Sequence, residues 1–166
     1  MDFEKFTQRS QGFLQAAQGL AARRNHQQLT PEHLLFVLLE DKEGLAANLI
    51  KSAGGDAQRA TMACGAALDK QPQVEGSGAS QLYMGRDLQR VLERASEAAE
   101  KAGDSFVTAE RLLLALALDD KSEAGRALKD AGVTPQGLNE AINAVRKGRT
   151  ADSASAEEGY DALNKY

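Results

Sequence analysis

The chain has 166 residues, of which 42% are hydrophobic and 27% are charged, and its formal net charge is −4. An acidic chain offers no broad basic face for nucleic acid, and its single cysteine, Cys64, excludes an internal disulfide and suits a reducing compartment. No apolar run approaches the roughly 18 residues that cross a membrane, and the start MDFEKF lacks the features of a signal peptide, so we expect a cytoplasmic protein with neither nucleic-acid nor membrane partners.

The first two predicted elements are helices with recognisable starts. An apolar stripe predicts a helix over residues 8–23, and Thr7 stands where an N-cap belongs, because its hydroxyl can accept a bond from a first-turn amide. A second helix is predicted from the cap Thr30 to about Glu40. Pro31 occupies its first helical position, where the missing N–H of proline costs nothing.

Two shorter segments complete the first half of the chain. A helix is predicted over residues 45–52, and it ends at Gly54 and Gly55, since glycine tolerates the left-handed conformation that closes helices. Asp56 is the expected cap of a fourth helix, which extends to about Leu68. Cys64 lies on the apolar stripe of this helix and is interpreted as a small core residue.

The second half of the chain repeats this plan after a linker. Residues 70–84 contain a proline and two glycines and have little to bury, so they are predicted to connect two halves. A helix over residues 86–102 follows, and Thr108, Ser122 and Thr134 are the expected caps of three more.

The two halves are copies of one another at an offset of 78 residues. Between Thr30–Gly54 and Thr108–Gly132, ten of the 25 positions are identical, without a gap. The sequence therefore predicts an all-α fold of eight helices in two pseudo-twofold repeats, over residues 7–69 and 85–147. Two such repeats would dock their apolar faces about an approximate two-fold axis and form a shallow aliphatic groove at the seam.

The last 19 residues differ in composition from the repeats. The stretch GRTADSASAEEG begins at Gly148 and has nothing obvious to bury, so it is predicted to be a mobile linker. Ser155 and Glu158 form a capping-box pattern, which predicts the start of a helix leading into a further domain.

No constellation of residues predicts catalysis, a cofactor or a metal. His26 and His33 lie on different predicted segments without a second ligand set, and His33 is expected at a surface or rim position. Cys64 lies on an apolar stripe, whereas a nucleophilic thiolate needs an exposed cleft. The acidic pair Asp119-Asp120 is expected to be solvated. The chain is therefore not expected to be an enzyme.

Four segments of the chain resemble the N-terminal domain of the ClpB disaggregases of the Clp chaperone family: MDFEKFTQRSQGFLQAAQGLA, LTPEHLLFVLLED, KQPQVEGSG and EEGYDALNKY. The resemblance implies a domain that contacts unfolded or aggregated polypeptides and helps to deliver them to the pore of a hexameric motor. ATP and magnesium would be cofactors of the longer parent alone, and a DnaK-type chaperone would be its partner. The isolated domain is expected to be monomeric.

The resemblance also implies candidate substrate-binding residues. The residues tied to substrate contact in this family correspond here to Thr7, Asp104 and Glu110, and each also has an ordinary structural interpretation as a cap, a loop acid and a first-turn acid. The predicted groove lies where the first helices of the two repeats approach. Its apolar lining is predicted to comprise Leu14, Leu88 and Leu92. Replacing Asp104 with alanine is expected to weaken binding with little loss of stability.

Two other functions remain open from the sequence. The domain could bind adaptor proteins or modified substrates for an unfoldase of the ClpA or ClpC type that works with a protease. It could also be a structural module that only positions the ATPase ring. The linker QVEGSG and the tail DALNKY favour the ClpB-type function over the first of these.

Overall fold

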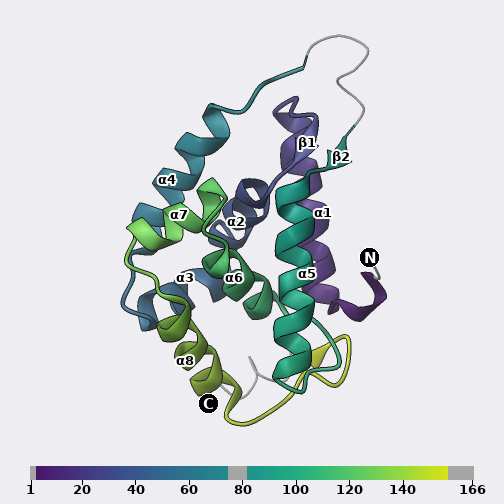
Figure 1. Ribbon diagram of the computed structural model, residues 1–166, viewed down its shortest axis with the longest axis vertical. Helices are drawn as coiled ribbons and strands as arrows, with labels where there is room; N and C mark the ends of the chain where they lie inside the picture. The colour runs from purple at the N-terminus through teal and green to yellow at the C-terminus, as the bar shows by residue number, and fades with distance from the viewer. Residues whose placement is uncertain (1–2, 75–81, 157–166) are drawn as a thin grey trace.

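The computed structural model describes residues 3–74 and 82–156, and over these residues the chain folds into eight α-helices with two very short strands (Figure 1). The predicted all-α class is confirmed. Within the same residues, no helix combines the length and apolar character needed to cross a membrane. The elements are a 3-10 turn η1 (Phe3–Lys5), α1 (Gln8–Arg23), β1 (Gln28–Leu29), α2 (Pro31–Leu39), α3 (Leu45–Ser52), α4 (Ala57–Asp69), β2 (Tyr83–Met84), α5 (Arg86–Lys101), α6 (Ala109–Leu118), α7 (Glu123–Asp130) and α8 (Pro135–Arg146).

The helices begin where the capping residues predict. The Thr7 hydroxyl accepts a bond from the Ser10 amide at 3.1 Å, and the Asp56 carboxylate accepts one from the Arg59 amide at 3.1 Å. Gly85 takes the position equivalent to Thr7 and starts α5 without a side-chain bond. Since each cap satisfies an amide that has no partner inside its helix, these residues fix where the chain turns from loop to helix.

The two repeats pack through equivalent elements. Helix α4 packs on α7 and α3 packs on α8, and these two contacts are related by the offset of the repeats. The central helices α2 and α6 also touch, with α1 contacting both of them and α5 likewise (Figure 1). The fold is therefore a two-fold assembly made within one chain.

Short parallel strand pairings cross between the repeats, and the sequence analysis did not predict them. Leu29, just before α2, pairs with Met84, just before α5. Phe6, just before α1, forms an isolated bridge with Val107, just before α6. The offset of 78 residues maps Phe6 onto Met84 and Leu29 onto Val107. The two pairings are thus equivalent, and each joins the start of one repeat to the middle of the other.

One continuous hydrophobic core includes residues from both repeats and contains the three leucines that were predicted to line a groove. Leu14 is 5% exposed, and Leu88 and Leu92 are fully buried. The predicted open groove at these residues is wrong, because α1 and α5 both pack onto α2 and α6 and turn their apolar stripes inward. The seam between the repeats is formed mainly by α4 with α7 and by α3 with α8.

The segment after α8, Gly148–Ala156, is docked on the domain, and we call it the C-terminal strap. Ala151 is fully buried, and its carbonyl accepts bonds from the amides of Ser105 (2.8 Å) and Phe106 (3.1 Å). The Ala154 carbonyl accepts a bond from the Gln8 amide at 2.8 Å. The prediction that this stretch has nothing to bury is therefore wrong, since a single small side chain and its backbone anchor it. Of the helix start predicted at Ser155 to Glu158, only Ser155 and Ala156 are described, and Ala156 is helical; Glu158 and the connecting residues 75–81 lie outside the described residues.

Asp119 is also buried, contrary to the expectation of a solvated charge. Its side chain receives two hydrogen bonds from Arg90, Nε to Oδ1 at 2.9 Å and Nη2 to Oδ2 at 2.9 Å. This bidentate pair ties the end of α6 to α5, the two helices that flank the groove described next.

Candidate functional groove

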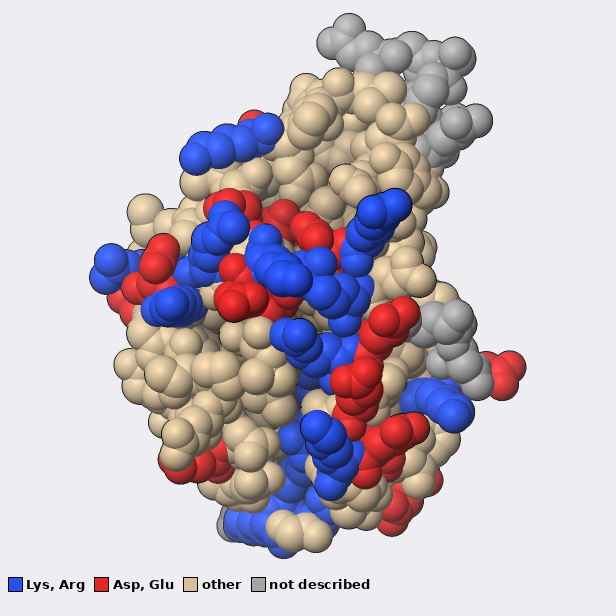
Figure 2. All heavy atoms as spheres, viewed as in Figure 1, with Lys and Arg blue, Asp and Glu red and all other residues tan. Residues whose placement is uncertain are grey.

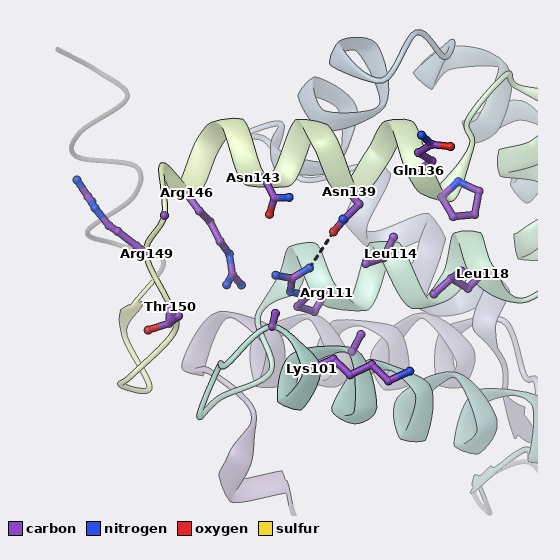
Figure 3. Close-up of a pocket in the computed structure, with 14 residues that line it drawn as sticks. Lys101, Arg111, Leu114, Leu118, Gln136, Asn139, Asn143, Arg146, Arg149 and Thr150 are labelled. Atoms are coloured by element: carbon purple, nitrogen blue, oxygen red, sulfur yellow. Dashed lines mark hydrogen bonds between the residues drawn. The ribbon is translucent and has the colours of Figure 1, made fainter.

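A groove with a volume of about 620 Å³ lies between α5, α6 and α8, and it is the candidate functional site (Figure 3). Helix α6 forms its floor, α5 and α8 form its walls, and the first residues of the C-terminal strap close one end. Its lining residues are Ala98, Lys101, Ala102, Arg111, Leu114, Leu118, Pro135, Gln136, Asn139, Asn143, Arg146, Gly148, Arg149 and Thr150.

The groove combines an apolar floor with side-chain amides. Leu114 and Leu118 lie one turn apart on α6, and Leu118 is 38% exposed. Asn139 and Asn143 lie one turn apart on α8, and Asn143 points into the groove (Figure 3). Within the described residues, the Asn143 side chain has no hydrogen-bond partner. Amides above aliphatic side chains can hydrogen-bond a polypeptide backbone while the leucines contact its apolar side chains.

The equivalent space in the first repeat is filled. Leu114 corresponds to Phe36, and Asn143 corresponds to Gly65. A Cβ atom on Gly65 would lie 3.5 Å from Cε1 of Phe36, so the phenylalanine ring occupies the space beside that glycine.

An ion pair further closes this part of the first repeat. The Nη1 of Arg24 lies 2.8 Å from Oδ1 of Asp69, which joins the ends of α1 and α4. The corresponding residues in the second repeat are Ala102 and Lys147, which cannot form such a pair. The second repeat has Leu114 and Asn143 in place of Phe36 and Gly65, and it lacks this ion pair. The space between its helices therefore stays open as the groove.

A buried charged network lies beneath one end of the groove. Arg146 is 3% exposed, and its Nη1 donates to both oxygens of Asp104 at 2.6 and 2.7 Å. Its Nε donates to Glu110 Oε1 at 3.0 Å, and its Nη2 donates to Thr108 Oγ1 at 2.8 Å. Burial alone would lower the pKa of Arg146, but the hydrogen bonds that it donates to Asp104 and the charge of Glu110 raise the pKa above its ordinary value.

Asp104 connects this network to the C-terminal strap. Its Oδ2 accepts a bond from Nε of Arg111 at 3.3 Å, and its Oδ1 accepts one from the Ala151 amide at 2.9 Å. The same carboxylate therefore holds Arg146, Arg111 and the strap. Removing it would leave two buried guanidinium groups short of a counter-charge, so the contacts do not support the expectation that Asp104→Ala spares stability.

The three polar residues predicted from the resemblance are all buried. Thr7 is fully buried, its amide donates to the Val107 carbonyl at 3.0 Å, and it caps α1. Asp104 is 7% exposed and Glu110 is 4% exposed, and both lie in the network beneath the groove. In this structure they position other residues and do not form an exposed rim.

The structure brings the two histidines together, which the sequence analysis did not foresee. His26 Nδ1 lies 2.8 Å from His33 Nε2, and His33 is fully buried, so its predicted surface position is wrong. The Thr30 amide donates to His33 Nδ1 at 3.0 Å. His33 must therefore carry its proton on Nε2 and donate it to His26. Burial lowers the pKa of His33 to about 4, with smaller contributions from His26 and Arg24.

Cys64 behaves as the core residue that was predicted. It is fully buried, its thiol donates to the Glu32 carbonyl at 3.2 Å, and burial raises the pKa of the thiol to about 12. A thiol of this kind is not a nucleophile near neutral pH. No cluster of three or more potential metal ligands is found in the described parts of the chain.

The groove residues on α6 and α8 were missed by the sequence analysis. Leu114, Asn139 and Asn143 were not singled out, because one leucine among several and two asparagines on a helix carry no individual signal. The usable signal lay in the comparison of the two copies, where Phe36 becomes Leu114 and Gly65 becomes Asn143.

Comparison with known proteins identifies the family. Residues 5–153 match the family model described as the Clp repeat (R) N-terminal domain. The chain belongs to this family. A chaperone protein ClpB of Rhodopseudomonas palustris is 60% identical over all 166 residues, and one of Rhizobium meliloti is 54% identical over the same length. These names favour the ClpB-type prediction over the ClpA or ClpC type. The chain spans 19% of the length of these relatives.

Solved structures of related domains share the fold. The N-terminal domain of Hsp104 from Candida albicans superposes with a TM-score of 0.79 at 24% identity, over 92% of this chain and 99% of that one. The N-terminal domain of the ClpV1 ATPase from Escherichia coli superposes with a TM-score of 0.67 at 24% identity, over 82% of each chain. At these identities the similarity supports the fold alone.

Proposed function

We propose that the groove between α5, α6 and α8 binds short apolar segments of unfolded or aggregated polypeptides. The observation that carries this proposal is the pairing of the exposed Leu118, next to the buried Leu114, with the amide of Asn143, which has no hydrogen-bond partner among the described residues. Such a surface recognises apolar side chains and peptide groups in general, and does not require one defined ligand.

The size of the groove is consistent with weak binding. Its volume of about 620 Å³ accommodates a few residues. Burying a few hundred Å² of apolar area at about 25 cal/mol per Å² gives several kcal/mol before the cost of ordering a flexible ligand. We therefore expect dissociation constants of roughly micromolar or weaker, which suits a domain that must pass its ligand onward.

In the longer parent protein, this domain would deliver such segments to the pore of a hexameric ATP-driven disaggregase that works with a DnaK-type chaperone in the cytoplasm. ATP and magnesium would bind to modules outside this chain, and hexamer formation would rest on those modules, so the isolated domain would be monomeric and non-catalytic. The names of the ClpB relatives support this assignment.

The proposal can be tested by adding a permanently unfolded protein, such as a reduced and carboxymethylated one, to the ¹⁵N-labelled chain. We expect chemical-shift changes at Leu114, Leu118 and Asn143. Leu118→Gln should weaken binding about three- to ten-fold, because it replaces exposed apolar surface with an amide.

Met62→Gln is the matched control. Met62 is 69% exposed on α4 and does not line the groove, so this variant should bind as the unmodified chain does. Equal losses of affinity in the two variants, or chemical-shift changes confined to other surfaces, would show that the groove is not the binding site.

A further inference from the structure

Arg111 presents unused hydrogen-bond donors inside the groove. Its side chain is 5% exposed, its Nε donates to Asp104, and its Nη1 donates to Asn139 Oδ1 at 3.2 Å (Figure 3). Its Nη2, however, has no acceptor within residues 3–74 and 82–156. A buried donor without a partner is destabilising, so an acceptor that enters the groove at this point would be favoured.

The charges around the groove favour an acceptor that is negatively charged. The lining contains Lys101, Arg111, Arg146 and Arg149 and no aspartate or glutamate. Figure 2 shows basic side chains along the line between α8 and α5, with acidic side chains beside them on the α5 side. Asp104 and Glu110 lie beneath the surface of the groove and offset the charges of Arg111 and Arg146. These arginines therefore contribute hydrogen-bond donors, and Lys101 contributes positive charge.

We propose that the groove selects apolar segments that carry an acidic side chain, an inference that rests on the proposed function. The apolar side chains pack on Leu114 and Leu118, and the carboxylate accepts hydrogen bonds from Nη2 of Arg111 beside the amide of Asn143. Lys101 on the opposite wall adds attraction from the side of α5. An acidic segment has the complementary charge, whereas a basic segment would be repelled by the same lining.

Three peptides with one apolar sequence and amidated C-termini test the proposal. The residue that follows the apolar stretch is Glu in one, Gln in the second and Lys in the third. Fluorescence anisotropy with the 166-residue chain should give affinities in the order Glu, Gln, Lys. We expect the Glu peptide to bind about three- to ten-fold more tightly than the Gln peptide at low ionic strength, and the gap to narrow with added salt.

Arg111→Gln should bring the affinity of the Glu peptide to that of the Gln peptide. Lys129→Gln removes the same charge from an exposed position on α7 outside the groove and should keep the preference. The peptide series on the unmodified chain does not depend on either variant folding.

Equal affinities for the three peptides would overturn this inference and leave the proposed function standing, whereas the absence of binding by all three would overturn both. A short oligothymidylate that competes as well as the Glu peptide would also overturn the inference, because it would show a surface for anions in general.

Discussion

At the scale of single residues, the two repeats form one equivalent side-chain contact with different residue types. His26 and His33 in the first repeat correspond to Asp104 and Arg111 in the second. Both pairs join the loop after the first helix to the start of the next one, at 2.8 Å in the neutral pair and 3.3 Å in the charged pair. The charged pair gains Arg146 as an additional partner, where the first repeat has Leu68. The divergence places two arginines beside the groove of the second repeat, at the positions that His33 and Leu68 occupy in the first.

The histidine pair predicts a pH dependence of stability. The pKa of folded His33 is lowered from 6.5 to about 4, so the unfolded state binds the proton more readily. The contribution of neutral His33 to the free energy of unfolding is therefore complete above pH 6.5, and it is lost as the pH decreases toward 4. Each such histidine changes it by about 1.4 kcal/mol per pH unit, or about 3 kcal/mol for His33 over this window. Urea denaturation at a series of pH values measures this slope.

The variant His33→Gln separates the contribution of His33 to this pH dependence from the contribution of the aspartates and glutamates, which titrate in the same range. Glutamine at the third helical position can still accept the bond from the Thr30 amide, as in a capping box, but it does not titrate. The variant should show a clearly shallower decrease between pH 6.5 and 4. Parallel curves for the two proteins would contradict the assignment.

The residue scale also shows where sequence reasoning stops. Caps such as Thr7 and Asp56 could be predicted because their partners lie three residues away. The burial of Asp104 and Asp119 could not, because Arg146 and Arg90 lie 42 and 29 residues away. An acidic residue in a loop is expected to be solvated when no basic residue is near it in the sequence, and only the fold shows that a distant arginine pairs with it.

At the scale of elements, the turn between α3 and α4 meets the turn between α7 and α8. The Asp56 amide donates to the Ala131 carbonyl at 2.9 Å. Gly54 and Gly132 close the two preceding helices with φ of +89° and +87°, a conformation that favours glycine. Helix bounds were predictable because such stop signals are local, whereas the strand pairings of β1 and β2 were not, since each contributes only two residues and is defined by its partner.

Gly55 gives a test of this contact. A Cβ atom there would lie 2.6 Å from Cγ2 of Val133 and 3.1 Å from the Ala131 oxygen, so Gly55→Ala must push the two turns apart. We expect a loss of about 1–3 kcal/mol in the free energy of unfolding, measured by chemical denaturation.

Gly12→Ala is the matched control, because Gly12 lies in the middle of α1 and nothing is within 4 Å of the added atom. That variant should instead gain about 0.5–1 kcal/mol from the higher helix propensity of alanine. A Gly55→Ala variant that is as stable as the Gly12→Ala variant would show that the turns do not pack as described.

At the scale of the whole molecule, the duplication could be predicted from the sequence, but the way its halves interlock could not. Each repeat contributes its first extended residue to the other, Phe6 to Val107 and Met84 to Leu29. The core is continuous across the seam. The expected seam between the first helices is absent because the contact surface of a repeat depends on how its four helices pack, which periodicity alone does not specify.

This interlocking predicts that neither repeat folds alone. A fragment of residues 1–74 would lose the partners of Phe6 and Leu29 and expose the faces of α3 and α4 that pack on α8 and α7. Units of this size bury too little surface to be stable without them. Circular dichroism should therefore show little cooperative structure in fragment 1–74 or fragment 82–166, whereas an equimolar mixture should regain helicity and sediment as a one-to-one complex. The intact chain is the control. The midpoint of its thermal unfolding should exceed that of the complex, because linking the halves removes the cost of association. A sharp thermal transition in either isolated fragment would instead mean that the repeats are independent domains joined by a linker, and that the crossed pairings are incidental to folding.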